Sequence, residues 1–323
     1  MTVLLDGAMG TEIERRGAPM KLPLWSAQAL LDDPALVQAI HRDYLLAGAQ
    51  VITTNTFRTH ARDLRQAGLN DQAKHLTQLA VHLARQARDE ATNEHSDLQR
   101  TAIAGSMSPL EDCFAPERSP VRARSLLEHR EIAEHLAEAG VDLLLIETMG
   151  RIDECCAAIE AAATTGLPLW LSVVGRSDGR LLGGESFEAL TRALHGLPVQ
   201  ALLINCTQLA DLPLVVPALL AAIAQTPEAT PLACGLFPHT GHSDPKLGWQ
   251  THTSDPESFA ESLFAELQAH PALQLVGSCC GSTPEWTRAL RDRVHPDPAA
   301  RARGFDELAA LLPTQVERSR PSC

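Results

Sequence analysis

Aromatic side chains are scarce in this chain, which has seven phenylalanines, four tryptophans and one tyrosine among 323 residues. Because aromatic residues usually supply much of the buried area of a core, their shortage predicts a core built from Leu, Ala, Ile and Val. An aromatic residue in a loop is more informative for the same reason. Trp25 precedes a capped helix, where it either packs on a neighbouring helix or faces a cationic methyl group.

Long apolar runs, basic runs and a targeting sequence are also absent. No apolar stretch reaches the length of a membrane span, and no basic segment precedes the strand-like run at Val3. The net charge of −13 disfavours a nucleic-acid backbone as partner. Eight cysteines without an export signal predict reduced thiols or metal ligands instead of disulfides. We therefore expect a soluble, cytoplasmic protein that binds neither membranes nor nucleic acid.

Short apolar runs alternate with amphipathic helical stretches along the chain. The eight expected strands are Val3–Leu5, Val51–Thr53, Thr101–Ala104, Asp142–Ile146, Leu169–Val174, Ala201–Ile204, Pro231–Gly235 and Gln274–Val276. The expected helices include Pro34–Gly48, Asp71–Glu90, Ser125–Gly140 and Ser186–His195. Eight strands, each followed by a helix, predict an α/β fold with a single (β/α)8 TIM barrel, and a doubly wound open sheet is the alternative. We place the barrel domain at residues 1–315 and a frayed C-terminal tail at 316–323.

The ends of the predicted strands carry the unusual residues, as expected for the catalytic face of a barrel. They are Asp6, Gly7 and Ala8 after the first strand, Asn55 and Phe57 after the second, Ser106 after the third, Glu147 after the fourth, Asn205 and Cys206 after the sixth, and Cys279 and Cys280 after the eighth. Such residues would gather on one face of the molecule.

Cys279 and Cys280 lie between glycines, after an apolar run and before a helix start at Ser282. Adjacent thiols cannot bond to each other without severe strain, because neighbouring side chains point apart. Both can reach one metal ion if the loop curls around it, and Cys206 offers a third thiolate. Three thiolates with an open fourth position match a catalytic zinc site.

Structural interpretations compete with these functional ones. A lone buried cysteine such as Cys206 is commonly a small core residue. Asp6 followed by Gly7 fits a tight turn with a helix cap as well as a ligand contact. Glu147 follows a buried run and needs a hydrogen-bond network or a cationic partner, which is either Arg151 or the ammonium group of a substrate. From these residues alone, both interpretations stay open.

The remaining histidines and cysteines are less informative. His239 and His242 are interpreted as polar loop residues that can also line the site. Cys155 and Cys156 are adjacent on one predicted helix, so their side chains point in different directions, and we assign them to helix packing. Cys234, at the seventh strand, is the nearest candidate for a fourth metal ligand. A closed site of four ligands would favour a zinc-binding or sensing barrel over an enzyme.

Together these motifs resemble a known family. The pair Asn205-Cys206, combined with Cys279-Cys280 between glycine and Gly-x-Thr-Pro, resembles the signature of the homocysteine S-methyltransferase family. The resemblance runs from Asp6 to Pro284, which is nearly the whole chain. The family consists of zinc-dependent (β/α)8 barrels with S-methylmethionine-, betaine- and cobalamin-dependent members, and so implies the fold that the strand count predicts.

The resemblance also implies roles for particular residues. The matching cysteines of the family bind Zn²⁺, which implies Cys206, Cys279 and Cys280 as the ligands here. Glu147 would hold the ammonium group of homocysteine, and Asp6 would contact the same amino acid. The other substrate contacts that we expect are Gly7, Ala8, Trp25, Asn55, Phe57, Ser106 and Asn205.

The implied reaction gives methionine. The thiol of homocysteine would take the open zinc position, lose its proton and attack, in line, the methyl group of an onium donor. Backbone N–H groups of residues 7–10 would bind the substrate carboxylate, and Asn205 would orient a zinc ligand or its loop. Orientation of the two reactants would carry much of the rate.

The methyl donor is the least determined element. The run Thr54–Phe57 is similar to cobalamin-dependent members, but the chain has no room for folate or cobalamin modules. Betaine-dependent members carry a tyrosine where this chain has Arg58. Residues 25–27 and 205–207 resemble S-methylmethionine-dependent members, although Ser278 departs from their pattern. We expect a sulfonium donor, S-methylmethionine or S-adenosylmethionine. The alternatives are a betaine-type donor or a separate corrinoid protein acting in trans, with homocysteine or another thiol as acceptor.

Overall fold

The computed structural model describes residues 2–226, 232–244, 248–250 and 255–312. Its centre is a sheet of eight parallel strands in the order β1-β10-β7-β6-β5-β4-β3-β2. The strands are β1 (Val3–Leu4), β2 (Val51–Thr53), β3 (Ala102–Met107), β4 (Leu143–Met149), β5 (Leu169–Val173), β6 (Val199–Gln208), β7 (Ala233–His239) and β10 (Leu273–Val276). A separate antiparallel pair joins β8 (His242–Asp244) to β9 (Gly248–Gln250).

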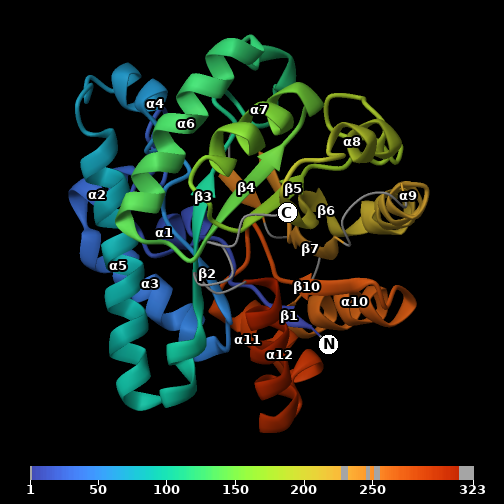
Figure 1. Cartoon of the computed structure of the whole chain (residues 1–323). Helices are drawn as coiled ribbons and strands as arrows, with labels where there is room; N and C mark the ends of the chain where they lie inside the picture. The colour runs from blue at the N-terminus through green and yellow to red at the C-terminus, as the bar shows by residue number, and fades with distance from the viewer. Residues whose placement is uncertain (1, 227–231, 245–247, 251–254, 313–323) are drawn as a thin grey trace.

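Contacts between the first and last strands of this order close the sheet. Leu5 forms a parallel bridge with Val51, and the N–H of Asp6 donates to the carbonyl of Val51 at 3.0 Å. Figure 1 shows the helices arranged around the strands. The predicted (β/α)8 barrel is therefore confirmed, and the alternative of an open doubly wound sheet is wrong.

The helices form the outer layer, and several of them begin at a residue whose side chain caps the first turn. They are α1 (Gly10–Arg15), α2 (Gln28–Asp32), α3 (Pro34–Ala47), α4 (Ala61–Gln66), α5 (Ala73–Glu94), α6 (Arg122–Ala139), α7 (Ile152–Ala163), α8 (Phe187–Ala193), α9 (Leu212–Ala224), α10 (Pro256–Ala269), α11 (Pro284–Val294) and α12 (Pro298–Leu311), with short 3-10 turns η1 (Ser96–Arg100), η2 (Pro116–Arg118) and η3 (Leu209–Asp211). The side chain of Asp33 caps α3 and that of Ser186 caps α8. Gly48 and Gly140 end α3 and α6 in the left-handed conformation, as predicted.

Alternating side chains of the strands build two cores. Leu144 and Ile146 face the outer core between sheet and helices, whereas Leu143 and Leu145 face the barrel interior. Phe305 of α12 belongs to the interior cluster, so this helix packs against the barrel interior. The two cores are mostly aliphatic, as the composition predicts. The aromatic members of the interior cluster are Phe237, Phe305 and the wholly buried Trp170.

Several strands run further than the sequence predicts. The third strand was expected to end at Ala104, but β3 continues through Ser106, which is therefore a strand residue and not a loop residue. Likewise β4 includes Glu147 and β6 includes Cys206. Register shifts in β4 and β6 let pairing resume beyond an irregularity. Apolar patterning alone does not predict these longer strands, because the polar residues within each shift resemble loop residues.

The structure also bears on three other expectations from the sequence: the C-terminal tail, the two histidines and the absence of a membrane span. The predicted tail, 316–323, lies outside the described residues, as does Pro231 of the seventh predicted strand. His239 ends β7 and His242 begins β8, so neither lies in a plain loop. None of the helices in the described part of the chain combines the length and apolarity that a membrane crossing needs.

Candidate active site

A cavity of about 430 Å³ opens at the carboxyl ends of the barrel strands. The residues that line it come from the loops after β1, β2 and β3, from the ends of β4, β6 and β7, and from the segment after β10. Its lining includes all but one of the site residues predicted from sequence, namely Asp6, Gly7, Ala8, Trp25, Asn55, Phe57, Ser106, Glu147, Cys206, Cys279 and Cys280. The exception is Asn205, which lies behind the wall.

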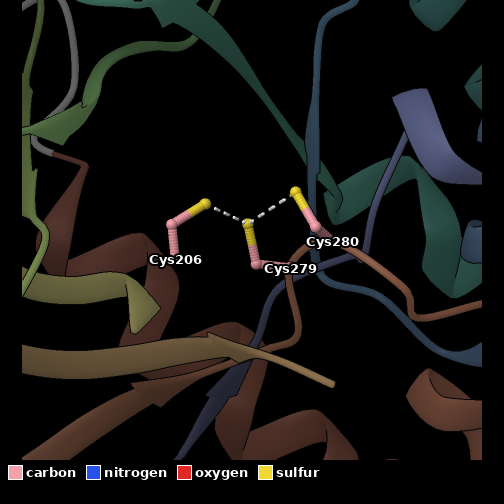
Figure 2. A group of neighbouring side chains, drawn as sticks. All are labelled: Cys206, Cys279 and Cys280. Carbon is pink, nitrogen blue, oxygen red and sulfur yellow. Dashed lines mark hydrogen bonds between the residues drawn. The ribbon is translucent and has the colours of Figure 1, made fainter. Parts of the chain in front are cut away.

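Three thiols converge in this cavity, as Figure 2 shows. Their sulfur atoms all lie within 4.8 Å of one another. The Sγ atoms of Cys206 and Cys279 are 2.9 Å apart, and those of Cys279 and Cys280 are 3.9 Å apart. Cys206 and the pair Cys279-Cys280, which are more than seventy positions apart in the sequence, thus direct their sulfur atoms toward one another. Among the described residues, no further Cys, His, Asp or Glu joins this group.

Backbone strain helps to aim the first of these thiols. Cys206 has a φ of 45° and Thr148 has a φ of 61°, a region that side-chain-bearing residues seldom occupy. Both positions fall within the register shifts of their strands. The unusual backbone turns the Cys206 side chain into the cavity at a point where regular alternation would not.

The thiols strongly affect one another's ionisation. The pKa of Cys206 lies well above its usual value because it donates to the other two sulfurs and is buried. The pKa of Cys280 lies well below its usual value because it accepts hydrogen bonds from Cys206 and Cys279. One thiolate solvated by two thiols is the state that these contacts favour without a metal. Full ionisation of all three requires an added positive charge.

Asn205 supports the Cys206 thiol from behind. Its Oδ1 accepts hydrogen bonds from Thr148 N at 3.0 Å and from Ser172 Oγ at 2.8 Å, and its Nδ2 donates to Thr148 Oγ1 at 2.8 Å. Thr148 Oγ1 in turn lies 4.0 Å from Cys206 Sγ. The amide therefore ties β4, β5 and β6 together beside the thiols, and it is fully buried.

Asp6 is a buried carboxylate on the cavity wall. Thr53 donates to it twice, from its N–H at 2.7 Å and from its Oγ1 at 3.0 Å. Burial raises the pKa of Asp6 to about 8, the two Thr53 bonds oppose that rise, and the charge of Glu147 adds to it. The side chain belongs to the cavity and does not cap a helix, because the N-cap position of α1 is Met9.

Glu147 is the second buried carboxylate of the cavity. Burial raises its pKa to about 8, although Ser106 Oγ donates a hydrogen bond to it. Arg151 is not its partner, because that guanidinium pairs with Asp153 at 3.5 Å. No salt bridge to either Asp6 or Glu147 occurs within the described residues, so the cavity holds two carboxyl groups whose charge is uncompensated.

Gly7 and Ala8 form the turn that brings α1 against the segment after β10. The N–H of Ala8 donates to Ser282 Oγ at 3.1 Å. A Cβ at Gly7 would lie 2.6 Å from that same oxygen and 2.9 Å from the Tyr44 ring. Glycine is therefore required at position 7 by close packing.

Two aromatic residues form one wall of the cavity. The rings of Trp25 and Phe57 meet edge to face with centroids 5.9 Å apart. The Trp25 ring also covers Gly10, where a Cβ would lie only 2.5 Å from it. Asn55 fixes this wall because its Nδ2 donates to Ser26 O at 2.9 Å. Trp25 thus contacts both the start of α1 and the cavity.

Comparisons with known proteins agree with this geometry. Residues 3–294 match the family model described as homocysteine S-methyltransferase. The chain belongs to the homocysteine S-methyltransferase family.

Individual relatives support that membership. The chain is 33% identical over 307 residues to homocysteine S-methyltransferase of Escherichia coli strain K12, covering 90% of this chain and 94% of that protein. It is 28% identical to homocysteine S-methyltransferase 2 of Zea mays, covering 92% and 91%. The crystal structure of the E. coli homocysteine methyltransferase MmuM in its metallated form aligns with a TM-score of 0.75 at 30% identity, covering 90% of this chain and 96% of that one. The family and the fold expected from the sequence are both confirmed, and the protein is an enzyme of this methyltransferase family.

Some expectations about the cysteines and histidines of this family member need correction. Cys234 lies in the outer core and is only 2% exposed, and its sulfur is not part of the group of three. It is therefore no fourth ligand. His239 does not line the cavity, and the side chain of His242 lies outside the described residues.

The sequence also missed part of the cavity wall. Asp112, Cys113 and Phe114 reach it from the loop after β3, and Met20 and Leu22 reach it from the loop before Trp25. Nothing in the local pattern marks them, since they follow no strand directly. The one available signal was the aromatic Phe114 in a chain with few aromatic residues.

Proposed function

We propose that this protein is a zinc-dependent methyltransferase that moves a methyl group from a sulfonium donor to the thiol of homocysteine, giving methionine. The observation that carries the proposal is the placement of three convergent thiols beside two buried, uncompensated carboxyl groups in one cavity. A metal ion and a substrate ammonium group are the two positive charges that such a cavity lacks.

The donor set suits zinc. Cysteine thiolates are soft ligands that zinc prefers, and three of them with no fourth protein ligand are typical of an open catalytic site. The three sulfurs lie within 4.8 Å of one another, so Cys206, Cys279 and Cys280 could hold one ion together. When bound, zinc would lower the pKa of a substrate thiol and keep it nucleophilic at neutral pH.

The chain's own residues would bind and orient the acceptor. Glu147 and Asp6 would take the ammonium group, and its charge would let both carboxyl groups ionise at neutral pH. The N–H of Ala8 is already bonded to Ser282, which leaves the neighbouring N–H groups of Gly7 and Met9 for the substrate carboxylate. Asn205 would keep Cys206 aimed at the metal through Thr148.

The donor would approach from the aromatic side of the cavity. Trp25 and Phe57 offer aromatic surface to a cationic methyl group, and the thiol would lie across the cavity from them. With both reactants held in this way, in-line attack needs little further reorganisation, and positioning would supply much of the rate.

The first test is a zinc assay on purified, reduced protein, followed by methionine formation from homocysteine with S-methylmethionine, S-adenosylmethionine and betaine offered separately. We expect about one zinc per chain and turnover with a sulfonium donor. Turnover with betaine alone would show that the donor is of the betaine type and not a sulfonium compound. Bound zinc with no turnover would point to a corrinoid protein as donor. Absence of zinc under reducing conditions would end the mechanism.

The acceptor site has its own test. A Glu147→Gln variant keeps the three thiols, so it should retain zinc but bind homocysteine about 10- to 100-fold more weakly, the usual effect of losing a charge-assisted hydrogen bond. A Glu160→Gln variant on the exposed side of α7 is the control. Unchanged homocysteine affinity in Glu147→Gln would remove the ammonium role.

A further inference from the structure

Arg58 brings a positive charge to a cavity otherwise rich in carboxyl groups. It follows β2 in the loop before α4 and lines the same cavity as the three thiols. Among the described residues that line this cavity, it is the sole Lys, Arg or His side chain. A guanidinium in such a place needs a reason, because repulsion would disfavour a cationic donor beside it.

The neighbours of Arg58 hold it without using all of its donors. Its Nη1 lies 3.0 Å from Asp63 Oδ2, and Asp63 also pairs with His60 at 3.1 Å. The guanidinium carbon lies 5.6 Å from the centre of the Phe57 ring. The side chain is only 11% exposed, and its Nε is buried without a hydrogen-bond partner among the described residues. A guanidinium has five N–H donors, so it retains donors for a ligand.

The position of Arg58 separates it from the acceptor carboxylates. Neither Asp6 nor Glu147 forms an ion pair with Arg58, whose ion-pair partner among the described residues is Asp63. The charge of Arg58 acts on Cys113 in the loop after β3, where burial raises the pKa of the thiol to about 12 and Arg58 opposes the rise. Arg58 therefore belongs to the side of the cavity formed by Phe57 and Cys113.

We propose that Arg58 binds a free carboxylate on the methyl donor and so selects onium donors of the amino-acid type. This inference rests on the proposed function. Phe57 links the two halves of such a donor site, because it contacts Trp25 on one side and the guanidinium on the other. The carboxylate accepts hydrogen bonds from the guanidinium donors that Asp63 leaves free, and the onium centre lies several bonds away, toward the thiols.

The test compares two donors that differ in this carboxylate. Binding of S-methylmethionine and of its methyl ester to the zinc-loaded protein is measured by calorimetry without homocysteine, so that no methyl transfer occurs. The wild type should bind the acid about 10- to 100-fold more tightly than the ester, as expected for a charge-assisted hydrogen bond. In Arg58→Gln the two affinities should converge, with unchanged affinity for the ester and unchanged zinc content.

Two further variants control the measurement. Arg58→Lys keeps the charge and should retain part of the preference for the acid. Arg65→Gln removes an arginine of α4 that does not line the cavity and should keep the full preference. The comparison of acid with ester in the wild type needs no variant, and it stands even if a substitution at position 58 impairs folding.

Each contrary result has a definite meaning. The inference is overturned if the wild type does not prefer the acid, if Arg58→Gln weakens both donors equally, or if it weakens homocysteine binding and leaves the donor preference intact. Methyl transfer from S-methylmethionine to homocysteine is measured in a separate experiment. An Arg58-dependent preference for the acid without turnover supports this inference while refuting the proposed reaction, so the two failures are distinguishable.

Discussion

Asp6 and Glu147 set the charge of the cavity at the level of single residues. Each is held by one hydroxyl-bearing neighbour, Thr53 or Ser106, and neither has a cationic partner in the described chain. A buried carboxyl group without a counter-charge is costly when ionised. Such an arrangement is expected where a ligand supplies the missing charge.

The same two carboxyl groups predict how stability depends on pH. Both have pKa values raised to about 8 in the folded protein, so the folded state holds protons that the unfolded chain has already released. In the zinc-free, ligand-free protein, the stability that these two groups contribute should therefore be complete below about pH 4 and be lost as the pH rises to about 8. Each group contributes about 1.4 kcal/mol per pH unit within that window.

Urea unfolding at pH 5, 7 and 9 measures this slope. The double variant Asp6→Asn, Glu147→Gln should show a flatter dependence, because neither side chain can ionise. A slope equal to that of the parent would contradict the assignment of these two groups.

The thiols give the second prediction at this scale. Cys279→Ser should reduce zinc content at least tenfold, because the hydroxyl is a far poorer ligand than a thiolate and only three ligands are present. Cys234→Ala is the matched control, since Cys234 lies in the outer core, and it should keep about one zinc per chain. Zinc content is measured on reduced, purified protein. Zinc loss in Cys234→Ala would weaken the three-ligand site.

At the scale of elements, the loop between β3 and α6 is the most consequential. It carries Asp112, Cys113 and Phe114 to the cavity yet is half exposed, and Glu154 of α7 ties down both of its ends. The carboxylate accepts from Leu110 N at 2.9 Å and from Ser119 Oγ, and His129 Nε2 lies 3.3 Å from it.

Removing this carboxylate should loosen the loop. Glu154→Ala leaves a buried N–H and a buried imidazole without their partner, which should lower the free energy of unfolding by about 2–4 kcal/mol. It should also raise the KM for the methyl donor while leaving homocysteine affinity unchanged. Glu160→Ala, at a half-exposed position on the same helix, is the control in urea unfolding and steady-state kinetics. An unchanged donor KM would show that the loop does not shape the donor site.

At the scale of the whole molecule, the barrel includes a helix, α12, that lies beyond the region matched by the family model. The match ends at residue 294, whereas α12 covers Pro298–Leu311 and places Phe305 and Leu308 in the interior cluster. α12 packs against β1, and Figure 1 shows the two close together. The interior of the barrel is therefore packed with help from a helix beyond the matched region.

Truncating Phe305 tests this packing. Phe305→Ala should lower the free energy of unfolding by about 3–5 kcal/mol, because it opens a cavity among wholly buried side chains. Zinc content and homocysteine affinity should stay unchanged, since the catalytic face is at the other end of the strands. Arg303→Ala, exposed on the same helix, should change stability by less than about 0.5 kcal/mol. A loss of zinc in Phe305→Ala would contradict this separation.

Much of the fold followed from the sequence because the strands of a barrel are buried on both faces. Their near-continuous apolar runs, such as Leu143–Ile146, stand out at regular spacing. The ends of the strands were harder to place. Pairing skips Glu147 and Cys206 at register shifts and resumes beyond them, and such shifts depend on the neighbouring strand, not on the local pattern.

The sequence by itself determined the barrel, the family and most of the candidate functional residues, because each depends on local runs and on motifs such as Cys279-Cys280. Only the tertiary structure decided which of them meet. It brought Cys206 within 2.9 Å of Cys279, left Cys234 in the outer core, and gave Arg151 to Asp153 instead of Glu147. Contacts of this kind depend on strand register, backbone strain and burial, and these exist only once the chain has closed into a barrel.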